Sequence, residues 1–248
     1  MTTDTNGTTG LLLIHAFPVD ARMWTDQLAS VDAVAPNLPG FGGSPPAGAV
    51  MTLSSAAARC LEALDAAGVE RAVVCGLSMG GYVAFELWRT ARHRIAGLVL
   101  ANTRAGADSQ EGAAGRRALA ARLLDEGNGF LVEQPPPLLS DRASDEVRSR
   151  VRELIADQPA ASVAAAALGM AERPDSTSDL AGIDVPTLVI ASDGDTLIPP
   201  ELTTPMADQI PGARLAMIEG AGHLSNLERP EEFIALLVEH AERCAAAP

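Results

Sequence analysis

Residues 71–85 read RAVVCGLSMGGYVAF, and this segment decides the fold. It opens with a valine-rich apolar run typical of a buried strand and closes with a run of helical composition. Between the two lies G-x-S-x-G, at Gly76, Ser78 and Gly80. This motif belongs on a sharp turn from a strand into a helix, where the serine hydroxyl is pushed out of the sheet. The segment therefore predicts that Ser78 is a nucleophile, against the alternative of a glycine-rich turn with an incidental serine.

Apolar runs and amphipathic stretches alternate on both sides of this segment. The apolar runs predict strands at residues 11–16, 31–35, 71–75, 95–101, 186–191 and 214–218. The amphipathic stretches predict a helical turn at 23–29 and helices at 52–67, 79–90 and 230–244. Apolar strands that alternate with helices are typical of a parallel sheet with both faces covered. The fold class is therefore α/β.

The alternation stops between residues 104 and 178, where no strand is predicted. Asp108 and Glu111 have the spacing of a capping box at the start of a helix. Three prolines at 135–137 then break the chain. Helices are predicted at 108–126, 144–157 and 159–173. We expect one α/β core with a helical cap inserted into it, the core made of 1–103 and 179–248 and the cap of 104–178.

The charge balance excludes some classes of partner. The chain has 248 residues, with 18 Lys and Arg against 32 Asp and Glu, and its formal net charge is −14. Nucleic acid and anionic membrane surfaces are disfavoured, because both attract clustered positive charge. Every Lys or Arg position is arginine, which excludes a catalytic lysine.

The three cysteines, Cys60, Cys75 and Cys244, are odd in number and form no C-x-x-C pair. Neither a disulfide framework nor a zinc site is predicted, and we expect no metal and no cofactor. Residues 1–9 lack the positive charge that begins a signal peptide, and the apolar run 11–17 is too short to cross a membrane. These features predict a cytoplasmic protein.

A serine nucleophile needs a base. Among the four histidines, His223 lies in a glycine-rich loop after the last predicted strand, where a catalytic base is readily mounted. The alternative for His223 is a structural loop histidine. His93 lies between two arginines and His240 beside Glu239, so both are interpreted as solvent-exposed. His15 ends the first strand.

The base needs an acid that fixes its tautomer, and the developing oxyanion needs two N–H donors. Asp193 and Asp195 are both candidates for the acid and both could be solvated loop carboxylates; Asp195 is preferred, because Asp193 precedes the flexible Gly194. The backbone N–H groups of Met79 and Phe17 are the candidate oxyanion donors. The loop around Phe17 could instead be only a strand end with a proline stop.

These motifs resemble the α/β-hydrolase superfamily over nearly the whole chain. The matching stretches are HAFP at 15–18, NLPGFGGS at 37–44, GLSMGG at 76–81, SDGDTLIPP at 192–200 and GAGHLSNLERPEEF at 220–233. The last stretch, with Asn226, Glu228 and Pro230, looks like the serine esterase and 3-oxoadipate enol-lactonase branch. The resemblance implies a hydrolase with a helical cap, in which Ser78, Asp195 and His223 form the triad and Phe17 and Met79 the oxyanion hole.

The chain departs from the family pattern in two places. Ala16 follows His15 where the family has glycine, and the chain begins ten residues before the strand predicted at 11–16. We therefore expect the family's leading antiparallel hairpin to be truncated or absent. Haloalkane dehalogenases and epoxide hydrolases of this fold carry aspartate at the position of Ser78, so a serine there implies acyl transfer.

Together these features predict a hydrolase for a small carboxylic ester. An enol-lactonase or a cofactor-free, haloperoxidase-like perhydrolase is the alternative, and a non-catalytic small-molecule binding protein is a remote one. A lactone that carries a carboxylate would need an arginine, for which Arg22 and Arg104 are candidates. The expected partner is a small ester or lactone. The sequence leaves open the oligomeric state and whether the cap moves.

Overall fold

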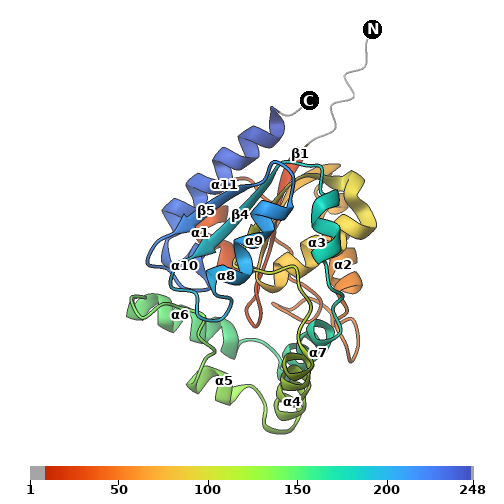
Figure 1. The fold of residues 1–248 in the computed structure, drawn as a ribbon. Helices are drawn as coiled ribbons and strands as arrows, with labels where there is room; N and C mark the ends of the chain where they lie inside the picture. The colour runs from red at the N-terminus through yellow and green to blue at the C-terminus, as the bar shows by residue number, and fades with distance from the viewer. Residues whose placement is uncertain (1–8, 247–248) are drawn as a thin grey trace.

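The computed structural model describes residues 9–246, and a parallel sheet runs through its centre (Figure 1). Its five strands are hydrogen-bonded in the order β1-β2-β3-β4-β5, and each neighbouring pair is parallel. The strands are β1 (Thr9–Ile14), β2 (Arg71–Leu77), β3 (Ile95–Ala101), β4 (Thr187–Ser192) and β5 (Arg214–Ile218). The predicted α/β class with a parallel sheet is confirmed.

Helices connect the strands and cover the sheet. The α-helices outside residues 104–178 are α1 (Thr25–Leu28), α2 (Leu53–Ala66), α3 (Met79–Ala91), α8 (Pro200–Thr203), α9 (Pro205–Gln209), α10 (Ser225–Glu228) and α11 (Pro230–Ala245). The short 3-10 helices are η1 (Ala21–Trp24), η2 (Arg92–Arg94) and η3 (Thr177–Gly182). In Figure 1, α11 runs along one side of the sheet, and α2 and α3 lie on the other.

The central strands are buried on both faces, as their continuous apolar sequence predicts. Every residue of β3 and β4 is buried, and so is every residue of β2 after Arg71. β5 lies at the edge of the sheet and is only partly covered, with Leu215 and Met217 exposed. The predicted bounds of β3 and β5 agree with the structure, whereas β2 continues two residues further, to the serine turn.

The strand predicted at residues 31–35 is wrong. Only Val34 pairs with the sheet, through a single bridge to Leu12. Its N–H donates to Leu11 O at 2.8 Å, and its carbonyl accepts from Leu13 N at 2.9 Å. Pro36 lies two residues further on and has no N–H to donate, so the ladder cannot be extended in that direction.

Residues 104–178 contain no strand in the structure, and their helices gather at one end of the sheet. These helices are α4 (Gln110–Glu126), α5 (Gly129–Glu133), α6 (Asp145–Ala156) and α7 (Ala160–Ala171). Figure 1 shows them together at the bottom of the view, at the end toward which the strands run from the N-terminus. We call residues 104–178 the inserted segment.

The capping box predicted at Asp108 and Glu111 is wrong, because the N-cap lies one residue later and the residue three positions after it is Gly112. Ser109 is the N-cap of α4, and its side chain accepts a hydrogen bond from Gly112 N at 3.1 Å. Asp108 instead forms ion pairs with Arg104, Arg116 and the buried Arg173. Burial raises the pKa of Asp108, but the hydrogen bonds from Arg173 and Arg116 outweigh it and lower the pKa to about 2. The local spacing does not reveal these distant partners.

His240 is buried, so its interpretation as a solvent-exposed residue is wrong. Its side chain lies 3.5 Å from Cys244 Sγ, and only 1% of the residue is exposed. Phe233, Leu237, His240 and Cys244 recur every three or four residues and form the buried face of α11. Helical periodicity, rather than the neighbouring Glu239, places this histidine.

Across residues 9–246, no single helix has the length and apolar character to cross a bilayer. Only α6 and α7 taken together reach that length and composition, across a bend of 93°. The prediction that residues 1–9 do not begin a signal peptide concerns a stretch of which residues 1–8 lie outside the described residues.

Candidate active site

Ser78 occupies the turn between β2 and α3 in a backbone conformation that L-residues rarely adopt. Its φ is 56° and its ψ is −113°. The turn is held on both sides, since Ser78 N–H donates to Ala101 O at 3.0 Å and Gly81 N–H donates to Ser78 O at 2.9 Å. Strain of this kind persists only where the surrounding structure enforces it, and it is concentrated at functional sites.

The glycines around Ser78 are required by close backbone contacts. A Cβ on Gly76 would overlap the Gly80 carbonyl, and a Cβ on Gly80 would overlap Ile14 O. A Cβ on Gly81 would overlap the side chain of Thr103. The motif therefore has a packing reason, because α3 approaches β1 and β2 too closely for any side chain at these positions.

His223 and Asp195 are brought into direct contact at the ends of β5 and β4. His223 Nδ1 lies 2.8 Å from Asp195 Oδ2, and both side chains are fully buried. Because a carboxylate only accepts, the contact assigns the ring proton to Nδ1 and leaves Nε2 as an acceptor. Nε2 is buried and has no hydrogen-bond partner among the described residues. It is available to accept a proton.

Asp195 is held by donors on both of its oxygens. Oδ1 accepts hydrogen bonds from Leu197 N and Ile198 N, each at 2.9 Å. Oδ2 accepts from Asn102 Nδ2 at 3.0 Å as well as from His223. The carboxylate is therefore fixed in orientation, and its buried charge is matched by N–H donors.

The other candidate acid, Asp193, lies on the surface of the same loop. It is exposed, and its Oδ1 accepts a hydrogen bond from Gly220 N at 2.6 Å. That contact ties the loop after β4 to the loop after β5. The structure thus places Asp195, rather than Asp193, against His223.

Asn102 was not singled out from the sequence. It is fully buried at the end of β3 with φ at 44°, and it touches Asp195. Its Oδ1 accepts from Ser225 Oγ at 2.7 Å, and its Nδ2 also donates to Ser192 Oγ at 3.1 Å. Its position directly after a predicted strand was the signal in the sequence, since polar residues at that sheet edge face the site.

The two candidate oxyanion donors, Met79 and Phe17, lie in the segments that follow β2 and β1. Met79 is the first residue of α3, and the first N–H groups of a helix have no partner within it. Phe17 is half-buried in the loop after β1. Ala16 N–H, on the neighbouring residue, points to Met23 Sδ at 3.2 Å. Because β1 and β2 are adjacent parallel strands, the segments that carry Phe17 and Met79 both begin at the carboxyl end of the sheet.

His15 supports this loop from beneath as a neutral side chain. Its Nδ1 donates to Ala16 O at 3.0 Å, and its Nε2 accepts from Leu38 N at 3.1 Å. Complete burial lowers the pKa of His15 to about 4, although the Ala16 carbonyl and Asp20 act in the opposite direction. Leu38 belongs to the NLPGFGGS stretch at 37–44, so His15 joins that stretch to the HAFP stretch at 15–18.

The low pKa of His15 predicts acid sensitivity. The pKa is about 4 in the folded chain against 6.5 in the unfolded chain, so between these values the unfolded state binds a proton that the folded state does not. The free energy of unfolding should therefore fall by about 3 kcal/mol as the pH drops from 6.5 to 4. Urea unfolding of the wild type and of His15→Gln across this range measures the effect.

The exposed His93 provides the control for this experiment. His93→Gln should keep the pH dependence of the wild type, because His93 is in contact with water in both states. His15→Gln should be less stable at pH 7 and show a shallower slope between pH 6.5 and 4. An unchanged slope in His15→Gln would contradict the role given to its burial.

Arg22 and Arg104, the candidate partners of a substrate carboxylate, are both paired within the chain. Arg22 lies 2.8 Å from Asp20 and 2.7 Å from Asp157. Arg104 is paired with Asp108. Their charges are already matched by these carboxylates.

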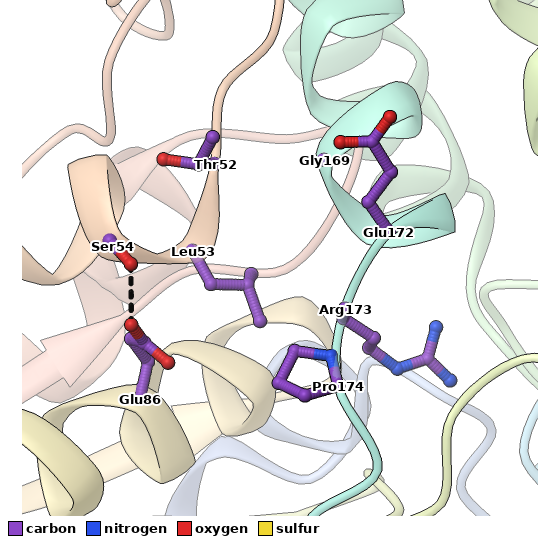
Figure 2. A pocket seen from close by; sticks show the side chains of 8 residues that line it. All are labelled: Thr52, Leu53, Ser54, Glu86, Gly169, Glu172, Arg173 and Pro174. Carbon is purple, nitrogen blue, oxygen red and sulfur yellow. Dashed lines mark hydrogen bonds between the residues drawn. The ribbon is translucent and has the colours of Figure 1, made fainter.

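A pocket of about 230 Å³ lies at the seam between the inserted segment and the core. Figure 2 shows the side chains that line it. Ser54 and Glu86 come from α2 and α3, and Gly169 from α7. Glu86 accepts a hydrogen bond from Ser54 and pairs with Arg89, so its charge is matched. None of Ser78, Asp195 and His223 lines this pocket.

Residues 9–246 contain no cluster of three or more His, Cys, Asp or Glu placed to hold a metal ion.

Comparison with known proteins gives consistent matches. The sequence model described as the alpha/beta hydrolase family matches residues 11–236. A thermophilic esterase from Thermogutta terrifontis superposes with a TM-score of 0.91 at 40% identity, covering 95% of this chain and 91% of that one.

Curated relatives include an esterase and an enol-lactonase. The pimeloyl-(acyl-carrier protein) methyl ester esterase of Aromatoleum aromaticum is 30% identical over 251 residues, covering 94% of this chain and 98% of the relative. The 3-oxoadipate enol-lactonase 1 of Acinetobacter baylyi is 28% identical over 236 residues, covering 91% and 86%. All three relatives are named for hydrolytic reactions.

Proposed function

Because the chain belongs to the alpha/beta hydrolase family, which matches residues 11–236, we propose that it cleaves a small carboxylic ester through an acyl-enzyme on Ser78. The observation that carries the proposal is the pair of His223 and Asp195. It leaves a buried imidazole nitrogen free to accept a proton at the sheet edge where the strained Ser78 lies. The esterase relatives support a hydrolytic enzyme.

In the proposed first step, His223 Nε2 takes the proton of the Ser78 hydroxyl while Oγ bonds to the ester carbonyl carbon. The carbonyl oxygen becomes negative and accepts hydrogen bonds from the N–H groups of Phe17 and Met79. The bond to the leaving oxygen then breaks, and the alcohol departs with the proton from Nε2. Asp195 keeps the ring oriented and stabilises its transient positive charge.

In the second step, water gives a proton to His223 Nε2, and its oxygen attacks the acyl carbon. The bond to Ser78 Oγ breaks, Oγ regains the proton from Nε2, and the carboxylic acid is released. All of these transfers use groups of this chain and water. We therefore propose a reaction without a cofactor or a resident metal, with the inserted segment acting as the cap over the substrate.

An enol-lactonase is the second candidate, because the Acinetobacter baylyi relative carries that name. The same acyl-enzyme chemistry opens a lactone. The pairing of Arg22 and Arg104 with carboxylates of the same chain favours a neutral lactone over one with a free carboxylate.

We also propose a cytoplasmic location, since Cys60, Cys75 and Cys244 are all unpaired thiols.

The test is hydrolysis of p-nitrophenyl acetate, butyrate and octanoate, run beside a neutral enol-lactone and an assay of peracid formation from acetate and hydrogen peroxide. We expect turnover of the short esters, and the preference among chain lengths measures the acyl site. A phosphofluoridate should abolish turnover: Ser78 Oγ bonds to phosphorus, fluoride leaves together with the hydroxyl proton, and the peptide that contains Ser78 gains the mass of the dialkylphosphoryl group less one hydrogen. Labelling of another residue with full loss of activity would overturn the assignment of the nucleophile.

A further inference from the structure

We propose that Gln158, in the inserted segment, is a positioning residue for the loop that carries Phe17. Its side-chain amide joins that loop to the stretch 37–44, which contains Gly42, and so sets the direction of the Phe17 N–H. The inference rests on the proposed role of Phe17 as an oxyanion donor. It gives the inserted segment a part in the reaction beyond covering the substrate.

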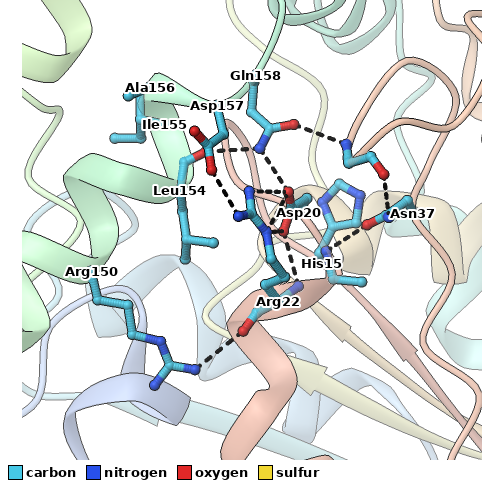
Figure 3. Close-up of polar contacts among 12 residues, drawn as sticks. His15, Asp20, Arg22, Asn37, Arg150, Leu154, Ile155, Ala156, Asp157 and Gln158 are labelled. Carbon is cyan, nitrogen blue, oxygen red and sulfur yellow. Dashed lines mark hydrogen bonds and ion pairs between the residues drawn. The ribbon is translucent and has the colours of Figure 1, made fainter.

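Gln158 is almost fully buried, and its amide is hydrogen-bonded on both sides (Figure 3). Nε2 donates to Asp20 Oδ2 and to Leu154 O, each at 2.8 Å. Oε1 accepts from Gly42 N at 3.0 Å. Both amide protons and the carbonyl oxygen are therefore used, and two of the three partners belong to core loops that lie more than 100 positions away in the sequence.

Asp20, the partner of Gln158, lies three residues after Phe17 and is fully buried. It is the N-cap of η1, and its Oδ1 accepts from Arg22 N at 2.9 Å. A displacement of Asp20 would move the start of η1 and the short loop before it. Gln158 is the donor to Asp20 that comes from outside the loop and η1.

Apart from the exposed ion pair of Arg22 with Asp157, three hydrogen bonds anchor the loop that carries Phe17 and the start of η1 to distant residues. His15 is bonded to Leu38 N, and Ala21 N donates to Asn37 Oδ1 at 2.9 Å. Both of these anchors come from the core, from the stretch that follows Val34. The third is the bond from Gln158 to Asp20, which alone of the three comes from the inserted segment.

Two surface ion pairs join the same parts of the chain and provide a comparison. Arg22 pairs with Asp157, and Arg150 with Asp26, with at least 31% of each side chain exposed. Exposed pairs of this kind contribute little, because water and salt screen them. Asp157 precedes Gln158, so the variant Asp157→Asn is a matched control at the same junction.

The backbone at Gln158 is held independently of its side chain. Asn128 Nδ2 donates to Gln158 O at 2.7 Å and to Ile155 O at 3.0 Å. A substitution at Gln158 should therefore change the contacts to Asp20 and Gly42 while leaving the path of the inserted segment in place.

Gln158→Glu removes both N–H donors of the side chain, to Asp20 and to Leu154 O, and keeps the acceptor. The new carboxylate can still accept from Gly42 N, but it cannot donate to Asp20 and it places two carboxylates side by side. We expect kcat on p-nitrophenyl butyrate to fall by about 10- to 100-fold, because small misplacements of catalytic groups carry costs of this size. KM should stay within about twofold, because the oxyanion forms only after the substrate has bound.

A boronic acid that forms a tetrahedral adduct with Ser78 measures the oxyanion hole directly. Its affinity for Gln158→Glu should fall by the same factor as kcat, whereas Asp157→Asn should match the wild type in both quantities. A residue that is merely structural would change the melting temperature without this parallel between kcat and boronate affinity.

Two results separate failure of the inference from failure of the proposed function. If Gln158→Glu has the kcat and boronate affinity of Asp157→Asn while Ser78→Ala is inactive, the inference is overturned and the proposed function stands. If Ser78→Ala keeps full activity, the proposed function itself fails. Gln158→Leu, which removes all three side-chain hydrogen bonds, should show a loss at least as large as Gln158→Glu.

Discussion

Ser78→Ala is expected to lower kcat on p-nitrophenyl butyrate by about 10⁴- to 10⁶-fold, because removal of a triad nucleophile leaves only the oxyanion hole and binding. The fold should be unaffected. Alanine at φ of 56° is strained as serine is, and the hydrogen bonds at this turn are made by the Ser78 backbone to Ala101 and Gly81. Steady-state kinetics, with circular dichroism as the check on folding, measures the result.

The control for this variant is Ser149→Ala, on the exposed side of α6. It should match the wild type in both kcat and melting temperature. Wild-type turnover by Ser78→Ala would show that another group is the nucleophile. Inactivity of the wild type toward every ester would leave the fold intact and shift the proposal to a narrow lactone or carbon–carbon bond substrate, or to a binding protein.

Asp195→Asn should lower kcat by about 10⁴-fold, because an amide in place of the carboxylate reverses the tautomer of the base. The contacts explain why. Leu197 N and Ile198 N both donate to Oδ1, so the amide of the variant keeps its carbonyl oxygen there and turns its NH₂ group toward His223. A donor then faces Nδ1, the ring proton moves to Nε2, and Nε2 can no longer accept the proton of Ser78.

Asp193→Asn is the matched control for that variant, two residues away in the same loop. Asp193 is exposed, and its Oδ1 accepts from Gly220 N, a contact that the asparagine oxygen can keep. We expect kcat within about twofold of the wild type, as for surface substitutions in general. A large loss in Asp193→Asn with activity kept in Asp195→Asn would exchange the two assignments. Both variants should be assayed at the same pH and checked for melting temperature.

Local patterns in the sequence were sufficient for the architecture. The apolar runs predicted β3 and β5 to the residue, and the turn from β2 into α3 followed from Gly76 and Gly80 around Ser78. These features depend on neighbours within a few positions, since strand periodicity and turn sterics are properties of the local chain. The one predicted strand that failed, at 31–35, is limited to a single bridge, and Pro36, which has no N–H to donate, ends it.

Other features required the positions of residues that are far apart in the chain. Asn102 meets Asp195 across 93 positions, and Gln158 meets Asp20 across 138. The ion pair of Asp108 with Arg173 likewise depends on a partner from the far end of the inserted segment. His240 is different, because the helical spacing of the apolar residues of α11 already places it on the buried face.

The sequence by itself therefore determined the α/β fold, the serine turn and the order in which the candidate catalytic residues occur. Only the tertiary structure decided which acid touches His223 and which loops the inserted segment holds. The physical reason is that periodicity and turn chemistry are encoded over a few adjacent residues, whereas hydrogen bonds between loops form only after the strands have aligned at one edge.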